Sequence, residues 1–381
     1  MIPSARSAVA PFVVMDVMEA AAKLERAGRR MLHMEVGQPS TPAPSTAIEA
    51  ASRGLKDDVL GYTVAVGVPA LRERIASHYG RTYGVDVGPE RIVVTTGSSG
   101  AFLLTFIAAL DAGARVAVAA PSYPCYRNIL QSLDVEAVAV PCGPDTRYEL
   151  TPELLDGLGR IDGVIVASPS NPTGSMIDGP HMAALAAWCE GRGAVLISDE
   201  IYHGIQYGFT PVTAAAFNHR AVVINSFSKY FSMTGWRVGW MVVPDNMVRT
   251  VEKLAQNLFI SAPTLAQLAA AAAFDATEEL DGHVANYATN RTLLLDVLPR
   301  LGLTTFAPPD GAFYVYADIT PWSADSVKFC ADLLDATGVA ITPGVDFDPA
   351  RGRHTVRFCY ARDVETVAEA MARLEGFVGR R

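Results

Sequence analysis

The chain has 381 residues, of which 50% are hydrophobic and 19% are charged. This length and composition allow one large hydrophobic core and a second, smaller one, so we expect two domains. With 31 basic and 40 acidic residues the formal net charge is -9, which argues against a broad surface that binds nucleic acid.

Neither a membrane span nor a signal peptide is expected. The most apolar opening stretch, residues 8–15, is short and is followed at once by Asp16, and the alanine-rich residues 268–274 are also too few and indicate a buried helix. The cysteines are odd in number and lack Cys-x-x-Cys spacing, which predicts free thiols in a reducing compartment and no disulfide frame or zinc site. They are Cys125, Cys142, Cys189, Cys330 and Cys359. The expected location is therefore the cytoplasm.

Strand-like apolar runs alternate with helical patterns along most of the chain. The predicted strands are residues 92–95, 116–120, 135–140, 164–167, 195–198, 222–225 and 238–243. This alternation predicts an α/β fold, with a mostly parallel seven-stranded sheet between helices on both faces. An N-terminal helix is expected from Phe12 to Ala27, ended by Gly28. The expected division is an N-terminal arm of residues 1–40 that joins the small domain, a large domain of residues 41–273 and a smaller α+β domain of residues 274–381.

A glycine- and serine-rich turn follows the first predicted strand of the sheet. Gly97, Ser98 and Ser99 come directly before an apolar, helix-like run at residues 101–110. Backbone N–H groups at the start of a helix, together with two hydroxyls, suit a bound phosphate. An ordinary serine N-cap explains the same residues equally well when they are taken alone.

A carboxylate ends another predicted strand. Asp199 follows the buried run at residues 194–197, and the run at residues 221–225 ends just before Ser226. Ligands of open α/β sheets bind outside the carboxyl ends of the strands, so both positions are expected to face one crevice. The alternative for Asp199 is a helix N-cap with Glu200 in the first turn.

A lysine among hydroxyls follows in the segment that begins at Ser226. Lys229 can form a Schiff base with an aldehyde, while Ser226, Ser228 and Arg237 can hold a dianionic phosphate. Pyridoxal phosphate is the cofactor that has both groups. By itself the lysine would be interpreted as a solvated residue at a strand-to-helix turn.

The carboxylate upstream agrees with this cofactor. Beside a pyridine nitrogen, Asp199 would keep that nitrogen protonated, and the protonated ring can take up electrons. Tyr202 is three positions further on and could reach the phenolate oxygen of the ring. The two motifs together therefore predict one cofactor site.

Arg357 lies in a segment whose alternating apolar residues predict a strand of the smaller domain. A guanidinium fork matches a carboxylate and fixes its orientation. An arginine that makes a weak surface ion pair is the alternative, which the residues alone leave open.

These motifs, in this order and over nearly the whole chain, resemble the class I and II aminotransferases, which are fold-type I pyridoxal-phosphate enzymes of the aspartate aminotransferase superfamily. Further matching segments are Val36-Gly37-Gln38-Pro39, Gly61-Tyr62-Thr63, Pro121-Ser122-Tyr123-Pro124, Ser170-Asn171-Pro172-Thr173-Gly174, Gly311-Ala312-Phe313-Tyr314 and Pro343-Gly344. The chain contains no Gly-x-Gly-x-x-Gly, no Walker lysine loop and no His-Glu-x-x-His.

The resemblance assigns roles to individual residues. It implies that Tyr123 stacks on the cofactor ring, although a turn tyrosine between two prolines is a common alternative, and that Asn171 donates to the ring oxygen. Tyr62 would cross to the phosphate of a neighbouring subunit, which implies a homodimer with shared active sites. The implied cofactor-binding residues are Gly97, Ser98, Ser99, Tyr123, Asn171, Asp199, Tyr202, Ser226, Ser228, Lys229, Arg237 and Tyr62. The implied substrate-binding residues are Arg357, Gly37 and Asn171, with Arg357 on the α-carboxylate.

The implied activity is exchange of an amino group between an L-amino acid and a 2-oxo acid by a ping-pong mechanism, with Lys229, Asp199 and Tyr202 as catalytic residues. A β-lyase, racemase or decarboxylase on the same fold is the nearer alternative. A cofactor-binding transcriptional regulator is remote, because no basic helix-turn-helix segment is present.

The substrate side chain is less well indicated. No second arginine stands out for a distal carboxylate, and residues 13–18, with His33, Val36 and Gln38, are expected to line the side-chain pocket. We expect His33 to be structural and not catalytic. In enzymes of this kind the acceptor is commonly 2-oxoglutarate or pyruvate.

Overall fold

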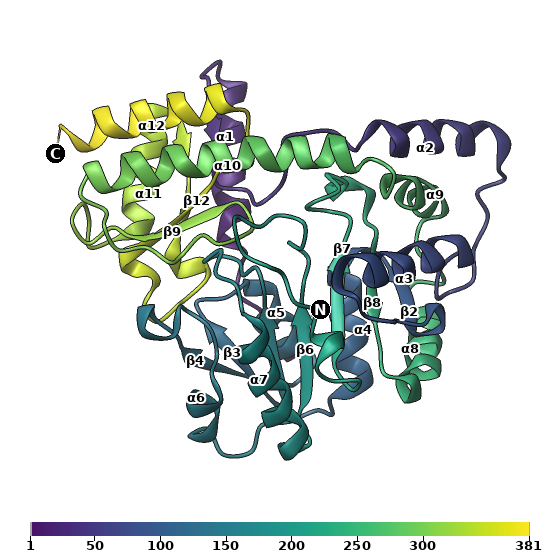
Figure 1. The fold of residues 1–381 in the computed structure, drawn as a ribbon. Helices are drawn as coiled ribbons and strands as arrows, with labels where there is room; N and C mark the ends of the chain where they lie inside the picture. Colours follow the sequence, from purple (N-terminus) through teal and green to yellow (C-terminus); the bar gives the residue numbers. More distant parts are fainter. Residues whose placement is uncertain (1, 381) are drawn as a thin grey trace.

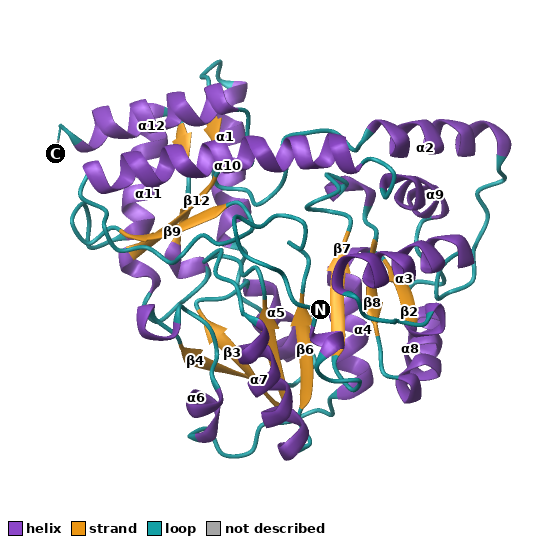
Figure 2. Ribbon diagram, in the orientation of Figure 1, coloured by secondary structure: helices purple, strands orange, loops and turns teal. Residues whose placement is uncertain are grey.

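The computed structural model describes residues 2–380, which form two sheet-centred regions (Figures 1 and 2). The larger region holds a seven-stranded sheet in the order β2-β8-β7-β6-β5-β3-β4. Only β8 runs against its neighbours, so the sheet is mostly parallel as predicted. The strands are β2 (Ile92–Thr95), β3 (Arg115–Ala120), β4 (Glu136–Pro141), β5 (Gly163–Ala167), β6 (Val195–Asp199), β7 (Val222–Ser226) and β8 (Gly239–Val242).

Helices cover both faces of this sheet because successive strand residues point to opposite sides. In β5, Val164 and Val166 belong to one buried cluster, and Ile165 belongs to another on the opposite face. The helices on the first face are α3 (Pro69–Tyr83), α7 (Gly179–Arg192) and α9 (Thr264–Ala273), with α2 (Ser45–Asp57) packed on α9. Those on the second face are α4 (Gly97–Ala109), α5 (Pro124–Ser132) and α8 (Asp245–Leu258). The short helix α6 (Pro152–Asp156) packs against α7.

The smaller region joins the two ends of the chain. It holds a three-stranded antiparallel sheet in the order β11-β12-β9 and a parallel pair in which β1 lies beside β10. The strands are β1 (Leu32–His33), β9 (Tyr314–Asp318), β10 (Val339–Ala340), β11 (Thr342–Pro343) and β12 (Thr355–Cys359). The helices are α1 (Val13–Arg26), α10 (Thr277–Arg300), α11 (Ser326–Thr337) and α12 (Val364–Val378). In Figure 1 the purple α1 accordingly lies among the yellow-green elements of the C-terminal part.

The predicted elements agree closely with the observed ones. Each of the seven predicted strands is present, with bounds that differ by at most a few residues, and the N-terminal helix begins and ends within one residue of its predicted limits. The domain limits at residues 40 and 273 stay predictions. Within residues 2–380 no helix is both long and apolar enough to span a membrane, and the cysteines found there are all unpaired.

Candidate active site

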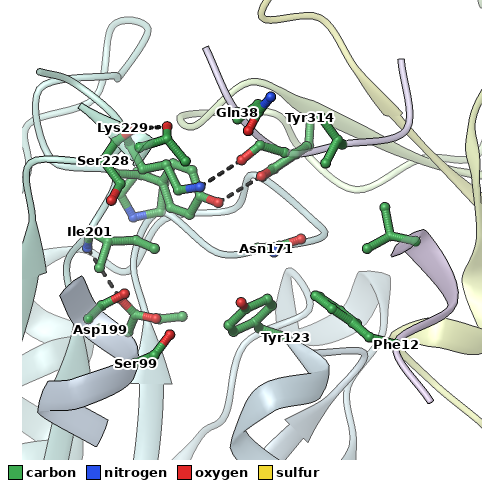
Figure 3. A pocket seen from close by; sticks show the side chains of 18 of the residues that line it. Phe12, Gln38, Ser99, Tyr123, Asn171, Asp199, Ile201, Ser228, Lys229 and Tyr314 are labelled. Atoms are coloured by element: carbon green, nitrogen blue, oxygen red, sulfur yellow. Dashed lines mark hydrogen bonds between the residues drawn. The ribbon is translucent and has the colours of Figure 1, made fainter. Parts of the chain in front are cut away.

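A cavity of about 200 Å³ opens at the carboxyl ends of the sheet strands, below the smaller region (Figure 3). Most of the predicted site residues line it, namely Gly37, Ser98, Ser99, Tyr123, Asn171, Asp199, Tyr202, Ser228, Lys229, Arg237 and Arg357. Gly97 and Ser226 do not line the cavity but contact residues that do. Gly97 lies against Arg237, and Ser226 forms a hydrogen bond with Ser228. Tyr62 does not line the cavity, and its side chain is 83% exposed.

Asp199 ends β6 and is buried at the floor of the cavity. Its carboxylate accepts hydrogen bonds from the hydroxyl of Tyr126 and, at 3.2 Å, from the backbone N–H of Ile201. A turn follows it instead of a helix, so the N-cap alternative does not apply. Burial raises the pKa of Asp199 to about 6, against which the two hydrogen bonds and Lys229 act. A cation placed next to this carboxylate would therefore be stabilised.

Lys229 follows β7 and approaches the cavity from the side opposite Asp199 (Figure 3). Its Nζ donates a hydrogen bond of 2.6 Å to the carbonyl of Gly37 and lies 5.7 Å from the centre of the Tyr202 ring. Burial lowers the pKa of this amine from 10.5 to about 8. A substantial fraction of Lys229 is therefore neutral, and nucleophilic, near physiological pH.

The start of α4 and Arg237 together form an anion site. Gly97 is the first residue of α4, and a Cβ built there would lie 2.4 Å from Nη2 of Arg237. Ser98 and Ser99 occupy the first turn, but no side chain caps this helix, so the serine N-cap alternative is wrong. The N–H groups of this first turn, the guanidinium of Arg237 and the hydroxyls of Ser98 and Ser99 thus lie together at the cavity.

Two further hydroxyls stand beside this anion site. Ser226 donates to Ser228 over 2.9 Å, and Ser226 also accepts the backbone N–H of Ser228 at 3.1 Å. This pair fixes the turn that carries Lys229.

Arg357 extends from β12 into the opposite end of the cavity and is only 3% exposed. Its Nη1 donates to Oδ1 of Asn171 over 2.7 Å, and its Nη2 donates to the carbonyl of Glu35. The guanidinium lies 4.4 Å from the centre of the Tyr314 ring and 4.7 Å from that of Phe347. Within residues 2–380 no carboxylate forms an ion pair with it, so the surface-pair alternative is wrong. A buried, unpaired arginine favours an anionic ligand.

Part of the cavity wall is apolar. Phe12 directly precedes α1, Val14 and Met15 lie in its first turn, and Val36 follows β1. Phe12 packs edge-on against Tyr123, with 5.8 Å between ring centres (Figure 3).

The prediction that His33 lines this wall is wrong. Its Nδ1 pairs with Glu35 at 2.8 Å and its Nε2 with Glu25 at 3.1 Å, outside the cavity. These two carboxylates raise the pKa of His33 to about 9, with the hydrogen bond to Glu35 as the largest cause. His33 thus has the structural role that we expected.

A family profile for aminotransferase class I and II matches residues 29–374. The chain belongs to this family. This aminotransferase is 50% identical over 374 residues to the valine–pyruvate aminotransferase of Mycobacterium tuberculosis. The aligned region covers 97% of this chain and 96% of that protein. The present chain therefore transfers an amino group between an amino acid and a 2-oxo acid, and its dependence on pyridoxal phosphate follows from the family.

Solved structures agree with this membership. A crystal structure of an aminotransferase from Mycobacterium tuberculosis has a TM-score of 0.98 and 48% identity, and covers all of both chains. A putative aminotransferase from Silicibacter pomeroyi has a TM-score of 0.95 and 52% identity, again over all of both chains. The expectations of an α/β fold of type I and of a transaminase are thereby confirmed.

Three residues of the aminotransferase site were not singled out as site residues in the sequence. Tyr126 holds Asp199, and its position one helical turn after Tyr123 on α5 could have indicated that both face the cavity. Tyr314 bonds the hydroxyl of Tyr202 at 2.7 Å. Phe12 stands directly before α1 and completes the apolar wall.

Proposed function

We propose that this aminotransferase takes its amino group from an aliphatic L-amino acid such as valine and passes it to pyruvate. The observation that carries this proposal is the buried, unpaired Arg357 in a cavity that also has an apolar wall. Such a site suits one carboxylate and a hydrocarbon side chain. The name of the Mycobacterium tuberculosis relative supports the same pair of substrates. Relatives named as aspartate aminotransferases are more distant, for example at 32% identity for that of Thermotoga maritima.

The residues of the cavity fit pyridoxal phosphate. Asp199 would face the ring nitrogen. Its raised pKa indicates that its negative charge is poorly compensated, and a protonated ring nitrogen would stabilise that charge. The phosphate would lie at the anion site made by the start of α4 and Arg237. When bound, the cofactor supplies an aldehyde that captures amines and a ring that accepts the electrons of a broken bond at the substrate Cα.

The chain's own groups would then act on the substrate. Arg357 holds the α-carboxylate and so fixes which Cα bond faces the reacting centre. Nζ of Lys229 removes the proton from the substrate Cα and later returns a proton, since its pKa near 8 suits both steps. Asn171 accepts from Arg357 through Oδ1, which leaves its Nδ2 free to donate to the cofactor ring oxygen.

We further propose that the protein is a homodimer. Tyr62 lies near exposed apolar side chains in the sequence, since Val59 is 97% exposed and Val64 is 57% exposed. Soluble monomers seldom expose several such side chains together. A second copy that covers them could bring Tyr62 to the phosphate of the neighbouring site. Sedimentation equilibrium should give about twice the chain mass of 40.6 kDa; a mass of one chain at micromolar concentration contradicts this proposal.

The substrate proposal is tested by half-reactions of the loaded protein with single L-amino acids in the absence of oxo acid. Valine should convert the absorption band of the lysine-linked cofactor to that of the amine form, with kcat/KM at least about tenfold above that for aspartate. Pyruvate should then restore the first band faster than 2-oxoglutarate. Preference for aspartate contradicts the proposed donor. With a cysteine thioether, whose thiolate can leave from Cβ, accumulation of pyruvate, thiol and ammonia over many turnovers would instead indicate lyase chemistry.

The rate at which the cofactor attaches should depend on pH through Lys229. Only the neutral amine attacks an aldehyde, and this amine loses its proton as pH rises through about 8. Attachment of pyridoxal phosphate to the cofactor-free protein should therefore accelerate from pH 6.5 and level off above about pH 8. Stopped-flow absorbance measures the rate. A midpoint near 10.5, the value of an ordinary lysine, contradicts the lowered pKa.

Gly97→Ala should weaken binding of pyridoxal phosphate by about tenfold. The new methyl group would displace the guanidinium of Arg237, since 2.4 Å is too short for a contact. The positive φ of +72° adds backbone strain of about 1 kcal/mol. Gly113→Ala is the matched control, because Gly113 has a φ of +82° and nothing within 4 Å of the added atom. Equal affinities in fluorescence titrations of the two variants would remove Arg237 from the phosphate site.

A further inference from the structure

The start of α1 is held by a residue that is distant in the sequence. Phe12 is the N-cap residue of α1 and offers no side-chain oxygen to the first N–H groups of the helix. The N–H of Val13 donates to Oδ1 of Asp346 over 3.1 Å, and that of Val14 donates to Oδ2 over 3.2 Å. Both oxygens of one carboxylate thus satisfy donors that a helix N-terminus leaves free. The negative charge is also favourable at this end of the helix dipole.

Asp346 is itself fixed within the smaller region. It ends the 3-10 turn Gly344–Asp346 between β11 and β12, and it is only 1% exposed. Its carbonyl accepts a hydrogen bond of 2.6 Å from Nη2 of Arg127. The next residue, Phe347, stacks on the guanidinium of Arg357. One dipeptide therefore contacts both the carboxylate-binding arginine and the helix that forms the apolar wall.

Few other contacts hold this wall from the N-terminal side. Residues 2–11 are exposed, and their contacts with α5 and the turn after it are exposed as well, such as the ion pair of Arg6 with Asp134. Within the cavity, Phe12 packs edge-on against the ring of Tyr123. The two hydrogen bonds to Asp346, one buried and one partly buried, are thus the polar contacts that hold the first turn of α1. Further along the helix, Val17 and Leu24 pack against a buried apolar cluster.

We propose that Asp346 is a positioning residue that holds the apolar wall of Phe12, Val14 and Met15 against the substrate side chain. Through this wall it sets the preference for a branched aliphatic amino acid over alanine. A branched side chain fills the space beneath this wall, whereas the methyl group of alanine is too short to depend on it. This inference rests on the proposed function for the identity of its substrates. The positioning of α1 by Asp346 stands on the hydrogen bonds alone.

The test compares Asp346→Asn with Asp363→Asn. Asp363 caps α12 through the N–H of Thr366, away from the cavity, so this control loses similar capping without touching the wall. In Asp346→Asn, kcat/KM for valine should fall about tenfold while that for alanine changes less than about twofold. The control should change neither. An equal loss for both amino acids would show a general structural role and overturn the proposal.

Hydrogen exchange provides a readout that is independent of activity. In the cofactor-loaded protein without substrate, amides of residues 12–18 should exchange faster in Asp346→Asn than in the unmodified chain, with residues 364–370 unchanged. Unchanged exchange at residues 12–18 overturns the positioning role. If the unmodified protein does not use valine as a donor, the proposed substrate fails, and the exchange result still decides whether Asp346 holds α1.

Phe12→Ala is a second test variant, which changes the apolar wall itself and not the residue that holds it. It should lower the ratio of valine to alanine kcat/KM by a similar factor. The double variant with Asp346→Asn should be no worse than the poorer single variant, because both changes remove one function of the wall. Fully additive losses contradict a shared role.

Discussion

Lys229→Ala is expected to abolish amino-group transfer, with kcat falling by about 10³-fold or more. Its Nζ is the amine of the cavity that can attach the cofactor, and it is the proposed group that moves the proton at the substrate Cα. Loss of both functions should leave only slow, unassisted steps. Steady-state rates with valine and pyruvate measure the fall, and loss of the absorption band of the lysine-linked cofactor measures the missing attachment.

The fold of this variant should persist. In the described chain the amine makes one hydrogen bond, to the carbonyl of Gly37, so the free energy of unfolding should change by about 1 kcal/mol. Lys253→Ala is a matched control, because Lys253 lies on α8 with an exposed side chain. The control should keep full activity. A Lys229→Ala protein that retains a tenth of the activity would refute the assignment of the lysine.

The large sheet could be predicted because its strands, apart from the edge strand β4, are mostly buried on both faces. Such strands appear in the sequence as short, continuous apolar runs, for example Gly163–Ala167, separated by helical patterns. Their parallel direction places every carboxyl end at one edge. Asp199 and Lys229 could therefore be assigned to one crevice before their distance in space was known.

Contacts between distant segments could not be predicted in the same way. Asp346 binds the N–H of Val13 across 333 residues, and nothing in the local pattern of either segment indicates it. The hydrogen bond of Tyr314 to Tyr202 spans 112 residues and joins the two regions. Helical and strand periodicity describe what each segment buries, but not which segment covers it. His33 was misplaced for this reason, since its partners depend on how α1 and β1 pack.

The environment of Arg357 is another feature that its sequence leaves open. The strand pattern of residues 355–359 was clear, and Arg357 could equally have faced solvent. The structure instead encloses it between the rings of Tyr314 and Phe347. Its hydrogen bonds go to neutral oxygens, namely Oδ1 of Asn171, the backbone carbonyl of Glu35 and the hydroxyl of Thr342. The positive charge is thus held in place but not neutralised.

Arg357→Ala is therefore expected to raise KM for valine and for pyruvate by about 100-fold each, which corresponds to about 2.7 kcal/mol. Both substrates present a carboxylate to the same guanidinium, so both half-reactions should suffer alike. Arg357→Lys should recover little of the loss, because an ammonium group cannot form the paired hydrogen bonds of the fork. Single half-reactions, followed by the change in cofactor absorbance, separate the two KM values.

Arg353→Ala is the control for this experiment, because Arg353 lies just before the same strand and pairs with Asp325 at the surface. It should leave both KM values unchanged, since exposed ion pairs contribute little. A loss confined to one substrate would mean that Arg357 does not hold a carboxylate common to both. Unchanged kinetics in Arg357→Ala would show that Arg357 binds the carboxylate of neither substrate. This result would refute the site geometry proposed for the substrate.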